Sequence, residues 1–217
     1  ATNRMLPRRR IEPIDANIKP VAEGGGIAVD QVMIGSCTNG SYRDIMITAA
    51  ALRGRRIAPN MSLGVACGSR QVLEMVSRNG ALADIVAAGG RILELACGFC
   101  IGNSQAPRSD AVSLRTSNRN FFGRSGTKSA QVYLVSPEVA AASALKGVIT
   151  DPRKLGSPPS IDLPENYPVE DNMLIPPLSA DEGAKIETIR GPNIKPVPLK
   201  GPLPKQLKGR VLIKVAN

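Results

Sequence analysis

Residues 31–40, QVMIGSCTNG, give the clearest indication of the fold of this chain. Residues 31–34, of which the last three are apolar, are followed by glycine and predict a strand, and the small polar residues after them predict a loop that holds Cys37. A helix is expected over residues 42–53, because Gly54 is a typical stop signal. This part of the sequence therefore predicts a strand, a cysteine loop and a helix in succession.

Strands and helices are predicted to alternate along the rest of the chain. The predicted strands are at residues 62–66, 91–95, 111–116 and 131–135, and the predicted helices are at residues 69–78, 82–88 and 137–147. Strands that alternate with helices predict an α/β fold, here a three-layer α/β/α arrangement with a mostly parallel sheet. Loops at the carboxyl ends of parallel strands share one edge of a sheet. Because Cys37, Cys97 and Asn118 each follow a predicted strand, we expect them to share a site.

A second pair of cysteines lies in residues 96–102, ACGFCIG. Cys97 and Cys100 have the Cys-x-x-Cys spacing of redox, zinc and cluster sites. A redox pair leaves Cys37 unexplained, and a zinc site needs a fourth ligand, which here is Cys67 or a carboxylate because the chain has no histidine. Three thiolates with one open position suit an iron–sulfur cluster. Spacing alone leaves a cluster, a zinc site and buried free cysteines open.

A third segment, residues 117–124 with the sequence SNRNFFGR, contains two arginines. Guanidinium groups bind carboxylates with two parallel hydrogen bonds, so Arg119 and Arg124 are candidates for binding an acidic substrate. The alternative is a surface loop with solvated charges. Asn118, like Asn39 in the first loop, either hydrogen-bonds the surroundings of the metal or serves turn geometry.

These three segments resemble the aconitase family of iron–sulfur hydro-lyases. The family has matching runs around its first cluster cysteine, its second and third cluster cysteines and its arginine loop, and residues 133–138 and 150–153 agree with it as well. The resemblance runs from about residue 32 to residue 153. It implies that a [4Fe–4S] cluster is bound by Cys37, Cys97 and Cys100. It also implies that Arg119 and Arg124 bind the substrate. Asn39 and Asn118 would lie in the cluster environment.

The resemblance also implies a function. The expected activity is that of an aconitate hydratase-like enzyme, which interconverts citrate and isocitrate through cis-aconitate in the tricarboxylic acid cycle. The alternative is the large subunit of a 3-isopropylmalate or homoaconitate dehydratase. A proline-rich tail that leads into a further strand favours the first. Cys67 departs from the family pattern, where proline is expected, and is interpreted as a buried free thiol.

Composition allows one further class of function. The net charge of +10 is compatible with a non-catalytic metal- or RNA-binding module. Basic residues are scattered, however, and the aromatic content of 3% offers few stacking platforms for bases. The composition therefore argues against a nucleic-acid partner. The sparse cysteines and the absence of a long apolar run favour the cytoplasm and argue against a membrane partner.

Four segments are expected along the chain. They are an entry segment at residues 1–30, a cluster-bearing domain at 31–154, a proline-rich linker at 155–207 and the first strand of a truncated domain at 208–217. Eleven of the 18 prolines follow residue 155, which predicts an irregular tail. The family resemblance implies that a preceding half and a final mobile domain belong to the enzyme, in the same chain or another. We expect the isolated chain to be inactive or nearly so.

Overall fold

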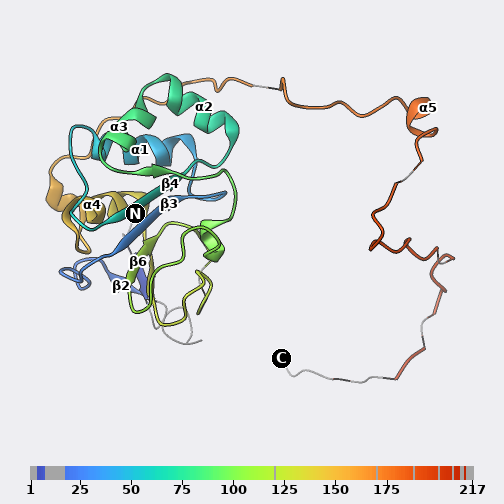
Figure 1. Cartoon of the computed structure of the whole chain (residues 1–217), viewed down its shortest axis with the longest axis horizontal. Helices are drawn as coiled ribbons and strands as arrows, with labels where there is room; N and C mark the ends of the chain where they lie inside the picture. The colour runs from blue at the N-terminus through green and yellow to red at the C-terminus, as the bar shows by residue number, and fades with distance from the viewer. Residues whose placement is uncertain are drawn as a thin grey trace. The chain divides into compact units, whose positions relative to one another are not determined.

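The computed structural model describes residues 4–7, 18–119, 121–169, 171–187, 189–199, 201–206, 208–210 and 213. It divides into two units at residues 170 and 171. The first unit contains the sheet and most of the helices (Figure 1). The second contains one short helix, α5 (Ala180–Gly183), and its described residues are exposed.

The first unit is built on a seven-stranded sheet in the order β2-β1-β7-β6-β3-β4-β5. Five neighbouring strands, from β7 to β5, are parallel, and β1 and β2 extend the sheet in antiparallel fashion. The bounds are β1 (Arg4–Pro7), β2 (Lys19–Pro20), β3 (Gln31–Gly35), β4 (Ser62–Ala66), β5 (Arg91–Ile92), β6 (Val112–Arg115) and β7 (Gln131–Leu134). The predicted mostly parallel sheet is confirmed.

Four helices cover one face of this sheet. They are α1 (Tyr42–Leu52), α2 (Arg70–Arg78), α3 (Ala81–Ala87) and α4 (Pro137–Lys146). Figure 1 shows α1, α2 and α3 grouped on one side of β3 and β4, and α1 also contacts α4. Alternate strand residues such as Val32, Ile34 and Leu114 join Ile45 of α1 in the main buried core. Burial of these apolar side chains drives the packing of the helices on the sheet.

The opposite face of the sheet has a different cover. Met33 of β3 and Ala66 of β4 form a smaller core there with Phe99 and Cys100. Phe99 and Cys100 belong to the 3-10 helix η2 (Phe99–Ile101), in the connection from β5 to β6. The third layer of the predicted α/β/α arrangement is therefore, over the described part of this connection, a loop with a single helical turn.

Helix starts follow the local sequence signals. Ser41 caps α1, and its Oγ and the carboxylate of Asp44 form a reciprocal capping box. Ser136 caps α4, and Pro137 occupies the first turn, where a missing N–H costs nothing. The predicted helix and strand ranges agree with the observed ones, except that β5 ends at Ile92 rather than near residue 95.

The entry segment at residues 1–30 contributes two strands that the sequence did not predict, because β1 pairs with β7 far away in the sequence. In the tail, α5 is one capped helical turn. The strand expected within residues 208–217 lies largely outside the described residues. No helix in the described part of the chain has the length and apolar character that crossing a bilayer requires.

Candidate metal centre

The carboxyl ends of the five parallel strands share one edge of the sheet, and the cysteine and arginine loops emerge there. The chain runs outward from β3 through β4 to β5, then returns to β6 on the other side of β3. The point where strand order reverses lies between β3 and β6, where ligands of open α/β sheets commonly bind. Cys37 follows β3 and Asn118 follows β6, so both lie beside this point.

The Cys37 loop is fixed by a close approach of two backbones. Gly35 has a φ of +98°, and a Cβ placed on it would lie 1.8 Å from the carbonyl oxygen of Ala66. Ser36 also has a positive φ, of 102°, and its N–H donates to that same oxygen over 3.2 Å. Positive φ is costly for a residue with a side chain. The turn that presents Cys37 therefore depends on glycine and on the end of β4.

Thr116 joins the Cys37 loop to the arginine loop. Its Oγ1 accepts from the N–H of Gly35 over 2.8 Å, and its N–H donates to the carbonyl of Met33 over 3.1 Å. The side-chain amide of Asn39 donates to the Thr116 carbonyl. Asn39, predicted to line the metal environment, thus binds the strand end from which Asn118 and Arg119 follow.

The three predicted ligand cysteines influence one another electrostatically. Cys37 and Cys97 are exposed and Cys100 is buried, and all are free thiols. The hydroxyl of Thr38, 3.8 Å from Cys37 Sγ, lowers the pKa of Cys37, and Cys97 contributes to the same effect. The pKa of Cys97 is raised, first by the charge of Cys37 and then by that of Cys100, whereas Arg119 lowers it. The structure brings these three thiols and Arg119 into one electrostatic neighbourhood.

Cys67 behaves differently, although it follows β4 at the same edge. Its side chain is 3% exposed and packs within the main core, and burial raises its pKa to about 11. A thiol that resists ionisation is a poor metal ligand, because the thiolate is the binding form. The geometry suits the buried free thiol that the sequence suggested.

The arginine loop lies against the connection that contains Cys97 and Cys100. Gly102 closes η2, and a Cβ placed on it would lie 2.1 Å from the Ser125 carbonyl oxygen. Asn118 and Arg119 are exposed. The guanidinium of Arg124 stacks on the ring of Phe121, 5.5 Å from its centroid. Arg124 Nε and Ser117 Oγ are buried and have no hydrogen-bond partner among the described residues. Two such donors fit an acceptor supplied by a ligand, such as a carboxylate.

The chemistry of the donor set suits an iron–sulfur cluster. Cysteine thiolates are the protein ligands of such clusters, and in a [4Fe–4S] cluster each thiolate binds its own iron. Three neighbouring thiols that repel as thiolates are stabilised by a cationic iron core. Cys37, Cys97 and Cys100 therefore fit a cluster.

Sequence reasoning missed Arg115, which lies on the second face of the sheet and is fully buried. Its Nη1 donates to the carbonyl of Phe99, and its Nη2 donates to the Gln105 carbonyl over 2.7 Å and to Gln31 Oε1 over 3.0 Å. Burial lowers the pKa of Arg115 to about 10, against the opposing charge of Cys100. In the alternating sequence Val112-Ser113-Leu114-Arg115, Arg115 shares a polar face with Ser113, so the pattern gave no signal of its burial.

Fold and site together define an α/β protein with a thiol cluster at a topological switch point. A model of the aconitase family (aconitate hydratase) matches residues 8–147, well over half of the chain. The chain belongs to the aconitase family, as the sequence resemblance predicted. Members of this family generally bind a [4Fe–4S] cluster.

Curated relatives refine this picture. The 3-isopropylmalate dehydratase large subunit of Herpetosiphon aurantiacus is 45% identical over 140 residues, which are 64% of this chain and 33% of that protein. The homoaconitase large subunit of Thermus thermophilus is 45% identical over 154 residues, which are 70% of this chain and 36% of that protein. The 3-isopropylmalate dehydratase large subunit 1 of Archaeoglobus fulgidus is 44% identical over 140 residues, which are 64% of this chain and 34% of that protein.

The chain spans about a third of the length of these curated relatives. Their names agree better with the alternative function, a 3-isopropylmalate or homoaconitate dehydratase large subunit, than with citrate and isocitrate interconversion. The expectation of a tricarboxylic acid cycle enzyme is correspondingly less supported than that of an aconitase-family protein.

Proposed function

We propose that the chain is the cluster-bearing part of a hydro-lyase of the 3-isopropylmalate dehydratase and homoaconitase type. The observation behind this proposal is the identity of 44 to 45% to such large subunits over 140 to 154 residues. The family match at residues 8–147 includes all three thiols and both arginines. The substrate class would be a small hydroxy di- or tricarboxylic acid. The free thiols suit a reducing compartment such as the cytoplasm.

Within this proposal, each loop at the sheet edge has a task. Cys37, Cys97 and Cys100 would hold a [4Fe–4S] cluster. When bound, the cluster supplies an iron without a protein thiolate, which acts as a Lewis acid toward the substrate hydroxyl group. Arg119 and Arg124 would bind and orient the substrate carboxylates. Orientation of this kind contributes strongly to rate because the reacting groups are already aligned.

The two asparagines would play supporting roles. Asn39 binds the Thr116 carbonyl and so fixes the strand end before the arginine loop. Asn118, exposed at the start of that loop, would hydrogen-bond in the surroundings of the cluster. A group that moves the substrate proton would come from another part of the enzyme, in the same chain or in a partner subunit. In this proposal, the described site would supply metal binding and substrate orientation.

A chimera tests this function. Residues 8–147 of this chain would replace the matching third of the Herpetosiphon aurantiacus large subunit, in its complete enzyme. We expect the chimera to dehydrate 3-isopropylmalate, and the same chimera with Cys97→Ser to be inactive while still folded by circular dichroism. Homoaconitate and cis-aconitate would be assayed in parallel. A folded, cluster-loaded chimera that acts on cis-aconitate and not on 3-isopropylmalate would support the citrate reading instead.

A further inference from the structure

Arg115 is an unusual residue to find inside a sheet. It is 0% exposed and projects from β6 on the face opposite the helices, where Gln31 and Ser113 also lie. None of the ion pairs between described residues includes it. A buried charge without a charged partner is costly. Its presence requires a compensating interaction.

Neutral acceptors supply part of this compensation. Arg115 Nε donates to Ser113 Oγ over 3.2 Å, and Gln31 Oε1 accepts from both Arg115 and Ser113. The remaining donors reach the carbonyls of Phe99 and Gln105. These two carbonyls lie at either end of the turn that contains Cys100. The guanidinium fork therefore holds the cysteine connection onto the sheet at two points.

The charge of Arg115 has one further neighbour. Cys100 packs with Phe99 in the smaller core on the same face of the sheet, and a thiolate at Cys100 would interact favourably with Arg115. Arginine stays protonated at neutral pH, so its positive charge is permanent. A fixed positive charge below a thiolate stabilises the thiolate and any anionic group that the thiolate holds.

We propose that Arg115 is a positioning residue for the metal centre, which holds the turn around Cys100 and supplies a fixed positive charge beneath it. The first part stands on the hydrogen bonds alone. The second part rests on the proposed function, because it requires a cluster bound to Cys100. The charge of the surroundings is one of the factors that set the reduction potential of a cluster. A nearby cation favours the reduced, more negative state and raises that potential.

The test compares Arg115→Met, Arg115→Lys and a control, Arg91→Met. Arg91 is exposed and donates to the side chain of Gln105 over 2.7 Å, so the control alters the same connection without touching the buried charge. In the metal-free chain, hydrogen exchange of the amides at residues 98–106 should quicken about tenfold or more in Arg115→Met. The carbonyls of Phe99 and Gln105 then lose their charged donor and keep only the Gly102 N–H and the Gln31 side-chain amide. The control should match the wild type.

After anaerobic reconstitution, the reduction potential of the cluster gives a second reading. It should fall in Arg115→Met and stay at the wild-type value in Arg115→Lys, which keeps the charge. Arg115→Lys also serves if Arg115→Met does not fold, because it should quicken exchange at residues 98–106 without changing the potential.

Unchanged exchange in the folded variants would overturn the loop-holding role, and an unchanged potential in Arg115→Met would overturn the electrostatic role. A wild-type chain that binds no iron would contradict the proposed function and the electrostatic role together, while the exchange result would still decide the loop-holding role.

Discussion

Two cysteines at the same sheet edge show how local surroundings decide what a thiol can do. Cys37 is exposed beside the Thr38 hydroxyl, which lowers its pKa, whereas Cys67 is buried in the core, which raises its pKa to about 11. The thiolate is the form that binds metal. The same residue type, one strand apart, is therefore suited to ligation in one loop and to packing in the next.

Burial of Cys67 predicts a pH dependence of stability. Its folded pKa of about 11 lies above the ordinary value of 9.0, so the unfolded chain loses this proton first as the pH rises. The contribution of Cys67 to stability is therefore complete below about pH 9 and is lost as the pH rises through about 11. Cys67→Ala should reduce the loss of stability over this range. Urea denaturation of both proteins across it measures the difference, and equal losses would contradict the burial argument.

The sequence predicts some site residues far better than others. Cys37, Cys97, Cys100, Arg119 and Arg124 could be singled out because their chemistry is legible in short motifs, although their roles remain proposals. The importance of Arg115 could not be read in this way. It depends on the carbonyls of residues 99 and 105, which only the folded connection brings to β6, and on the face of the strand from which its side chain projects.

Strand β3 and the turn after it are the elements on which the candidate site depends most. Gly35→Ala would place a Cβ 1.8 Å from the Ala66 oxygen at a φ of +98°. We expect a loss of stability of more than about 3 kcal/mol, because both backbone strain and a backbone clash oppose the substitution.

Gly54→Ala is the matched control, since Gly54 has a φ of +68° with nothing within 4 Å of the added Cβ. It should cost about 1 kcal/mol. Thermal unfolding of both variants checks this, and equal losses would show that the contact with β4 does not matter.

Elements with strong local signals could be predicted from the sequence. A serine cap before α4 and a glycine after it predicted the range of this helix, and apolar runs predicted β3 and β4. Strands β1 and β2 could not be predicted, because β1 depends on long-range pairing of Leu6 and Pro7 with β7. Two-residue strands such as β2 and β5 carry too little periodicity to recognise.

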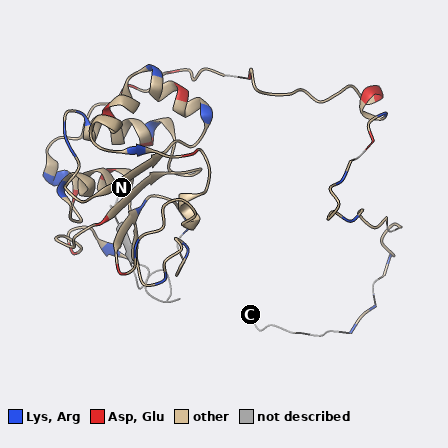
Figure 2. Ribbon diagram, viewed as in Figure 1, with Lys and Arg blue, Asp and Glu red and all other residues tan. Residues whose placement is uncertain are grey.

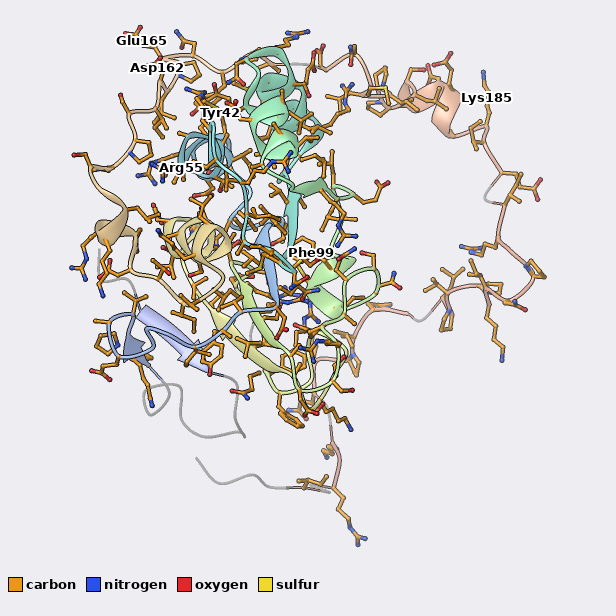
Figure 3. The ribbon with its side chains drawn as sticks, turned by 60° about the vertical axis from the view of Figure 1, so that its left-hand side comes forward. Tyr42, Arg55, Phe99, Asp162, Glu165 and Lys185 are labelled. Carbon is orange, nitrogen blue, oxygen red and sulfur yellow. The ribbon has the colours of Figure 1, made fainter. Side chains whose placement is uncertain are left out.

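The first unit includes the start of the proline-rich part of the chain as well as the α/β core. Tyr167 packs edge-on against Tyr42 of α1, with 5.8 Å between ring centroids, and the Pro168 carbonyl accepts from the side chain of Gln71. Figure 3 shows Tyr42 together with Asp162 and Glu165 of the segment that leads to this contact. The segment up to residue 169 is therefore held against helices of the core.

This contact predicts a pattern of limited proteolysis. A broad protease such as subtilisin should cut first within residues 171–206, whose described residues are exposed, and leave a resistant core that ends near residue 169. Tyr42→Ala removes a ring contact worth about 1 kcal/mol and should move the end of the core toward residue 156. Mass spectrometry of the fragments reads the result. Cuts at residues 157–169 as early as those in the second unit of the wild type would contradict the contact.

At the scale of the whole molecule, charge and tail composition proved weak guides to function. Figure 2 shows Lys and Arg on helices, loops and the tail rather than on one element. The proline-rich tail favoured the citrate reading, but the relatives favour 3-isopropylmalate and homoaconitate dehydratases. Two arginines proposed to bind carboxylates would not distinguish acids that all contain carboxylates. The substrate could not be predicted because the discriminating contacts are not among the motifs.

The central claim, that three of the four cysteines hold a cluster, is tested most directly by iron and sulfide content after anaerobic reconstitution. The wild-type chain should bind about four iron and four sulfide ions, as a [4Fe–4S] cluster requires. Cys67→Ser should bind as much, and Cys97→Ser should bind little or none. A wild-type chain that binds a single metal ion through all four cysteines, or a Cys97→Ser variant loaded like the wild type, would contradict the account.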